Sequence, residues 1–274
     1  MLATRSMPGA GWGANLPATP STTQFGTRLT ASATPHAKGS YAQLVASTLY
    51  DVHGLWLIVN GSAVAATRTD MMLDLAIGAA SSEVVILPEF LCGWRSAPTV
   101  GPQAVFLPFF IPKGTRIAAR LQSLIASDTL DVQVFLEYGA GPPPAGLFRR
   151  ADAYGTSAAS SIGTSHTPGS SGSESTAANI GSTLARDYGA VMLQVQGTLS
   201  NTTMTGIAYH WELRIGGATW AEWYSCSFTT EAVTSGPYPP TPLQRRLPAG
   251  TQLQIRAEAS GTAQAHDVAF YCFY

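Results

Sequence analysis

The chain has 274 residues, which suits two domains of ordinary size, and charged residues make up only 11% of it, less than half the usual share of about a quarter. The formal net charge is -1 and no basic run occurs, so the composition excludes a nucleic-acid-binding surface. No stretch approaches the roughly 18 apolar residues of a membrane-spanning helix. A surface rich in Ser, Thr, Gln, Asn and Gly loses little on desolvation, which favours burial against other subunits, and a GC-rich genome would favour a similar composition.

Residues 1–40 are rich in Gly, Pro, Ala, Ser and Thr, with Trp12 and Phe25 as isolated aromatic residues. They show no sustained helical or strand periodicity and have too few apolar side chains to form a core of their own. We therefore expect an extended N-terminal arm that becomes ordered only by lying on a partner. No basic segment followed by an apolar run occurs at the start, so no signal peptide is expected there.

From Tyr41 the pattern changes to short apolar or alternating runs separated by glycine and proline, which is typical of β-strands. The run 55–59 ends at an Asn-Gly turn signal, and 130–138 alternates apolar and polar residues as a half-buried strand does. Further runs of this kind lie at 71–77, 82–87, 104–111 and 116–122. Residues 41–139 are therefore predicted to form an antiparallel β-sandwich.

Residues 140–181 begin with a Pro-Pro-Pro segment and continue into a Ser/Gly/Thr-rich stretch, which predicts a linker. A weak echo of the N-terminal arm is present, because Gly26-Thr27 and Gly155-Thr156 each precede a Ser/Ala-rich stretch. If the echo is a true repeat, each sandwich has a leading arm of its own.

Residues 182–274 repeat the first sandwich. The segment 107–120 recurs 136 positions later as 243–256, with five identical residues in matching places: Leu107, Pro112, Gly114, Thr115 and Arg120. The fold prediction is therefore an all-β protein of two tandem antiparallel β-sandwich, jelly-roll-like domains that arose by internal duplication. The Pro-x-Gly-Thr phrase is interpreted as a tight turn, because proline fixes φ and glycine permits positive φ.

No sequence motif indicates catalysis. Arg120 with Asp131 recurs as Arg256 with Asp267, and we interpret each pair as a structural ion pair between neighbouring strands. The five histidines lack metal-ligand spacing, and the three cysteines are expected to be buried thiols. We predict no catalytic, cofactor-binding or metal-binding residue and expect that the protein is not an enzyme.

Aromatic residues gather in the segments 209–213 and 220–224. Core packing accounts for most such residues, but an outward-facing Trp can insert into a protein pocket or stack on a sugar ring. The candidate interface residues are Trp12, Phe25, Trp211, Trp220 and Trp223.

The arm, the low-lysine β-sandwich and the phrases Ile111-Pro-Lys-Gly-Thr-Arg-Ile117 and Leu247-Pro-Ala-Gly-Thr-Gln-Leu253 resemble virion structural proteins of tailed bacteriophages. The resemblance implies a capsid decoration, or cement, protein that ties neighbouring capsid subunits together in the virion after synthesis in the host bacterial cytoplasm. It implies a major capsid or tail protein as partner. Low charge predicts self-association as a homo-oligomer, and the resemblance supplies the number three for a trimer.

Other functions stay open on the sequence alone. A tail-tip, baseplate or fibre-associated structural protein also needs oligomeric β-domains with anchoring arms. A glycan-binding β-sandwich module would need an outward-facing Trp211, Trp220 or Trp223. A hydrolase with an unrecognised site is a further alternative.

Overall fold

The fold is described from a computed structural model of the chain. It describes residues 12–14, 26–61, 70–93, 103–139, 145–197, 207–216, 221–230, 242–261 and 265–274. Within these residues all the regular secondary-structure elements are β-strands, and the strands pair antiparallel. This confirms the all-β prediction. None of the described segments forms a helix that is long and apolar enough to cross a membrane.

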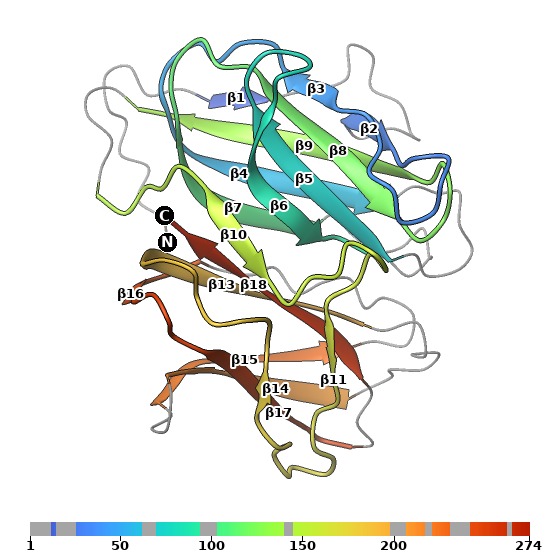
Figure 1. The fold of residues 1–274 in the computed structure, drawn as a ribbon, viewed down its shortest axis with the longest axis vertical. Helices are drawn as coiled ribbons and strands as arrows, with labels where there is room; N and C mark the ends of the chain where they lie inside the picture. Colours follow the sequence, from blue (N-terminus) through green and yellow to red (C-terminus); the bar gives the residue numbers. More distant parts are fainter. Residues whose placement is uncertain are drawn as a thin grey trace.

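In the described part of the chain, eighteen strands form four sheets, and the two halves are stacked one above the other (Figure 1). The first half contains β1 (Trp12–Ala14), β2 (Thr27–Thr30), β3 (Ala42–Val45), β4 (Val52–Gly61), β5 (Met71–Ile77), β6 (Val84–Leu91), β7 (Gln103–Ile111), β8 (Ile117–Ser123) and β9 (Thr129–Tyr138). The second contains β10 (Ala151–Tyr154), β11 (Thr164–His166), β12 (Ala178–Asn179), β13 (Tyr188–Gly197), β14 (Ile207–Ile215), β15 (Ala221–Thr230), β16 (Leu243–Leu247), β17 (Leu253–Ala259) and β18 (His266–Phe273).

The two halves have the same strand order. In the first, a sheet of order β1-β9-β4-β7, with β2 also on β9, accompanies a sheet of order β3-β8-β5-β6. In the second, the corresponding orders are β10-β18-β13-β16, with β11 also on β18, and β12-β17-β14-β15. The agreement extends to single residues, because Ala42 pairs with Ala119 as Ala178 pairs with Ile255. That the halves arose by duplication stays a prediction about their origin.

The repeated turn has the geometry that its residues predict. Gly114 and Gly250 both have a φ of 79°, a left-handed conformation that favours glycine. The Gly114 N–H donates to the Thr48 carbonyl at 2.9 Å, and the Gly250 N–H donates to the Leu184 carbonyl at 2.8 Å. The turn therefore anchors the strand that follows it, β8 or β17, to the loop before β4 or β13.

The segments expected to be an arm and a linker contribute strands to the sandwiches. Within residues 1–40, β1 and β2 pair with β9 of the same chain, so the chain supplies its own partner for part of the expected arm. Within residues 140–181, β10 and β11 pair with β18, and β12 pairs with β17. The second segment is thus more than a linker, because its backbone hydrogen bonds complete the sheets of the second sandwich.

The two sandwiches share a hydrophobic core through β18, which is buried along its whole length. Val268, Phe270 and Cys272 belong to the core of the second sandwich, whereas Ala269, Tyr271 and Phe273 belong to the core of the first. A strand with two apolar faces must lie between two layers. The second sandwich therefore covers the side of the first at which β6 and β7 lie.

Aromatic contacts and hydrogen bonds complete this junction. The rings of Phe109 in β7 and Phe273 in β18 lie 5.5 Å apart between centroids, as do those of Phe90 in β6 and Tyr271 in β18. The Tyr271 hydroxyl donates to the Glu89 carbonyl at 2.8 Å and accepts the N–H of Leu91 at 2.8 Å. One side chain thus satisfies two backbone groups of β6 that would otherwise be exposed at a sheet edge.

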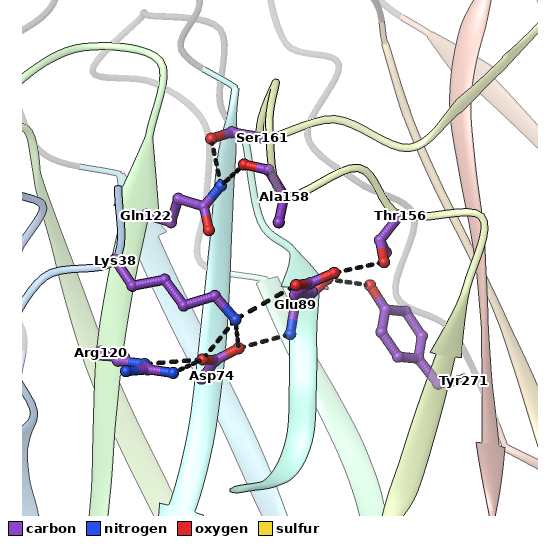
Figure 2. Close-up of polar contacts among 9 residues, drawn as sticks. All are labelled: Lys38, Asp74, Glu89, Arg120, Gln122, Thr156, Ala158, Ser161 and Tyr271. Atoms are coloured by element: carbon purple, nitrogen blue, oxygen red, sulfur yellow. Dashed lines mark hydrogen bonds and ion pairs between the residues drawn. The ribbon is translucent and has the colours of Figure 1, made fainter. Parts of the chain in front are cut away.

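A network of charged and polar side chains holds residues 156–161 against the sheet that contains β5, β6 and β8 (Figure 2). Asp74 on β5 accepts bonds from Lys38 at 3.0 Å and Arg120 at 2.8 Å. Lys38 also pairs with Glu89 at 3.3 Å, and Glu89 accepts the hydroxyl of Thr156 at 2.6 Å. The junction between the halves is therefore partly apolar and partly hydrogen-bonded, and the ion pairs of the first half hold Glu89 in place for Thr156.

The predicted ion pair between Arg120 and Asp131 is wrong, because these residues lie on opposite sheets. Arg120 is on β8 and pairs with Asp74, whereas Asp131 is on β9 and pairs with Arg28 of β2 at 2.9 Å. β8 and β9 follow one another in the chain but belong to different sheets, and this crossover separates the two charges. The predicted pair of Arg256 with Asp267 is wrong for the same reason, because β17 and β18 belong to different sheets and Arg256 pairs with Glu174 and Glu212.

We predict that Tyr271→Phe destabilises the protein by about 1–3 kcal/mol, because it leaves a buried N–H and a buried carbonyl without their shared hydroxyl. Thermal unfolding measures the effect, with Tyr50→Phe at an exposed tyrosine as the matched control. Equal melting temperatures for wild type and Tyr271→Phe would show that these two bonds contribute nothing.

We further predict that acid destabilises the second sandwich through His166. This ring is buried, lies 5.9 Å from Trp211 between centroids and bonds Ser175 at 2.8 Å. Burial lowers the pKa of His166, so its contribution to stability is complete above the unfolded value of about 6.5 and is lost as pH falls below it. Melting temperatures measured between pH 7.5 and 5 should decline less steeply in His166→Gln than in wild type or in His210→Gln. Parallel declines would contradict this.

Candidate functional site

The outward side of the sheet of β4, β7 and β9 carries a patch of aromatic residues. In β4 the side chains alternate, so Leu55 and Leu57 are buried while Trp56 is only half-buried on the opposite face. Trp56 pairs directly with Phe106 on β7 and with Phe135 on β9. We call this surface the outer face and define it by Gly54, Trp56, Ile58, Phe106, Gln133, Phe135 and Glu137.

The rings of the outer face are held in place by their neighbours. The Trp56 and Phe106 centroids lie 5.4 Å apart at an interplanar angle of 58°, and the Trp56 indole N–H donates to the Glu137 carboxylate at 3.1 Å. Gly54 makes room for Phe106, because a Cβ at this position would lie 2.6 Å from the Phe106 ring. The cluster is therefore arranged before any partner arrives, which lowers the entropic cost of binding.

The same face of the second sandwich is a protein interface within this chain. Shifting the outer-face positions on β4 and β9 by 136 gives residues that are all at most 1% exposed: Ala190, Met192, Gln194, Ala269, Tyr271 and Phe273. All of them except Gln194 belong to the core shared with the first sandwich, and the Gln194 amide donates to the Leu91 carbonyl at 2.9 Å. Of two equivalent sheet faces, one is thus covered by protein, while the outer face remains partly exposed.

The chemistry of the outer face suits protein contact better than catalysis. Aromatic residues are enriched in the buried centres of protein interfaces. In the described part of the chain, no group of three or more His, Cys, Asp or Glu residues is placed to hold a metal ion. Cys92 and Cys272 are buried free thiols, as expected, and burial raises the pKa of both thiols; the side chain of Cys226 lies outside the described residues.

Two carboxyl groups do approach each other in the second half. Glu174 and Glu212 form a hydrogen bond with each other, and both pair with Arg256. Burial raises the pKa of Glu174; burial also acts to raise that of Glu212, but hydrogen bonds, chiefly from Arg256, outweigh it and lower that pKa. Because Arg256 and Glu212 repeat the pairing of Arg120 with Asp74, we assign this cluster a structural role.

Of the interface residues predicted from the sequence, Trp211 lies in the core of the second sandwich with 0% of its surface exposed, so it is unavailable to a partner. Trp12 and Trp223 lie in β1 and β15, and their side chains fall outside the described residues, as do Phe25 and Trp220 altogether.

Trp56, Phe106 and Phe135 were not predicted as interface residues from the sequence. Trp56 stands in an apolar run that resembles a fully buried strand, which concealed its exposure. The available signal was a difference between the two halves of the repeat. The position equivalent to Trp56 has a Met in the second half, which indicates that the two positions have different surroundings.

No protein-family model and no curated protein matches the chain. Among solved structures, PNGF-II is similar at a TM-score of 0.36 and 9% identity over 94% of this chain and 63% of that chain, so this chain spans less than two thirds of it. The tandem CBM22 domains of Paenibacillus barcinonensis Xyn10C are similar at 0.28 and 12%, covering 96% and 93%. The VP2 subviral particle of infectious bursal disease virus is similar at 0.26 and 13%, covering 97% and 68%. Likeness at these scores does not bear on function.

Proposed function

We propose that this protein is a non-enzymatic structural component of a virion that binds other proteins through the outer face. The observation that carries the proposal is the pair of equivalent sheet faces. The face on β13 and β18 is buried against another sandwich, and the face on β4 and β9 presents Trp56 and Phe135 in the same places. A surface built like an existing protein interface is suited to become a second one.

The composition supports an assembled state. Few charges have to be desolvated when such a surface is buried, because only 11% of the residues are charged. The outer face has an aromatic centre and, at Glu137, an acidic group that is still partly exposed. Interfaces with aromatic anchors and a polar rim concentrate binding energy in a few residues.

A capsid decoration role extends this proposal. A cement protein binds many equivalent sites on one shell, so modest contacts at each site add to high avidity. A tail-tip, baseplate or fibre-associated role would use the same surface at few copies. Quantitative mass spectrometry of purified particles separates the two, with hundreds of copies expected for decoration and a few for a tail component.

Glycan binding is the second candidate, favoured by the partly exposed aromatic rings beside Gln133 and Glu137. Two observations weigh against it. The Trp56 and Phe106 rings are tilted by 58° and so do not form a flat platform, and the indole N–H is already bonded to Glu137. Glycan-array binding that Trp56→Ala abolishes would establish this candidate in place of the first.

We predict that Trp56→Lys weakens attachment to stripped virus particles by about 30-fold or more, the effect of losing a central aromatic anchor. Val84→Lys, at another exposed apolar residue, should attach normally and serves as the matched control. Co-sedimentation of full-length protein with particles measures attachment, and thermal unfolding confirms that both variants fold. Undiminished attachment of a folded Trp56→Lys would remove the outer face from the proposal.

A further inference from the structure

The contact that joins the two sandwiches is of the head-to-tail kind, because it uses different surfaces on its two sides. The second sandwich contributes a sheet face on β13 and β18, and the first contributes its β6–β7 edge. Each sandwich has both surfaces, since the halves share one strand order. The chain therefore retains one further surface of each kind: the outer face of the first sandwich and the β15–β16 edge of the second.

The residues at these two remaining surfaces are chemically complementary. Within the chain, Phe109 of the edge meets Phe273 of the face at 5.5 Å. The repeat replaces Phe109 by Arg245 on the second edge and Phe273 by Glu137 on the outer face. An apolar pair thus becomes a basic and an acidic residue, one on each surface, so a contact between these two surfaces would bring opposite charges together.

The β15–β16 edge has the features of a selective docking edge. In the described part of the chain, β16 is hydrogen-bonded to β13 alone and β15 to β14 alone. The central residues of β16 (Gln244, Arg245 and Arg246) are exposed. Charges on an edge strand prevent indiscriminate strand pairing while still permitting an acidic partner.

Cation–π contacts between an arginine and an aromatic ring recur in this protein. Guanidinium groups lie over the rings of Tyr41, Phe110 and Tyr274 at 4.6, 5.5 and 4.3 Å from the centroids. Arg245 facing Glu137 would also come close to the aromatic row of Trp56 and Phe135, where the same kind of contact forms.

We propose that a second copy of this chain docks its β15–β16 edge on the outer face, repeating the contact that joins the two halves and pairing Arg245 of one copy with Glu137 of the next. The inference rests on the proposed binding role of the outer face and names the partner. A contact between unlike surfaces leaves one free surface at each end of a dimer. Further copies then add until the assembly closes into a ring or extends as a filament.

Sedimentation velocity of the full-length protein from about 1 to 100 μM tests this. Glu137→Arg and Arg245→Glu should each weaken self-association by tenfold or more, because each places like charges at the contact. The double variant should restore it, since it only exchanges the two charges. An equimolar mixture of the single variants should also reassociate in alternating order, because every contact between unlike variants pairs opposite charges. Arg150→Glu, an exposed arginine elsewhere, is the matched control and should assemble as wild type does.

A wild-type protein that stays monomeric at 100 μM, or single variants that assemble unchanged, would overturn the inference. The same result would leave the proposed function standing if Trp56→Lys still abolished particle attachment, because that experiment does not depend on self-association. Conversely, charge-swap rescue together with normal particle attachment of Trp56→Lys would support the self-contact and separate it from the virion role.

Discussion

The architecture depends on the burial of one strand from both sides. All eight residues of β18 are buried, and the six from Val268 to Phe273 alternate between two hydrophobic cores instead of between a core and water. A strand without a polar face is stable only between two apolar layers. The position of the second sandwich, the cover over Phe90 and Phe109, and the bonds of Tyr271 to the backbone of β6 all follow from this requirement.

The sequence predicts the interior of each sandwich better than the contact between the sandwiches. Alternation in β9 and β17 and the glycine turns at Gly114 and Gly250 follow from local physical rules, and the repeat lets one half support the other. The junction depends on positions at which the halves differ, such as Trp56 against Met192. Such a difference indicates that the two positions have different surroundings, but it does not say which of them is covered. The strands β10 to β12 were not predicted, because their low-complexity segment pairs through backbone hydrogen bonds. Such pairing needs no alternation of apolar and polar side chains, so the sequence carries almost no sign of it. The outer face was not predicted for a related reason. Whether an apolar strand is covered on one side or on both depends on its neighbours in the fold, not on its own sequence.

The polar networks of the two halves show the same logic of paired positions. In the first half Lys38 lies beside Asp74 and Arg120; 136 positions after Lys38 stands Glu174, beside Glu212 and Arg256. The sign at this position is reversed, and Arg214, which pairs with Glu212, adds the compensating positive charge. With Glu89, which pairs with Lys38, the first cluster has two acidic and two basic side chains, as the second does. Pairing opposite charges limits the cost of desolvating them. The two clusters therefore have the same net charge of zero, although the residues at matching positions differ.

The order of the strands along the chain has a consequence for synthesis. The edge formed by β6 and β7 leaves the ribosome more than 150 residues before β18, the strand that covers it. During that interval Phe90 and Phe109 have no companion ring from β18, and the backbone groups of β6 that Tyr271 later satisfies remain open to solvent or to another chain. The β6–β7 edge of the first sandwich is therefore covered only after the second has been translated, and a nascent chain exposes this edge before its own cover exists.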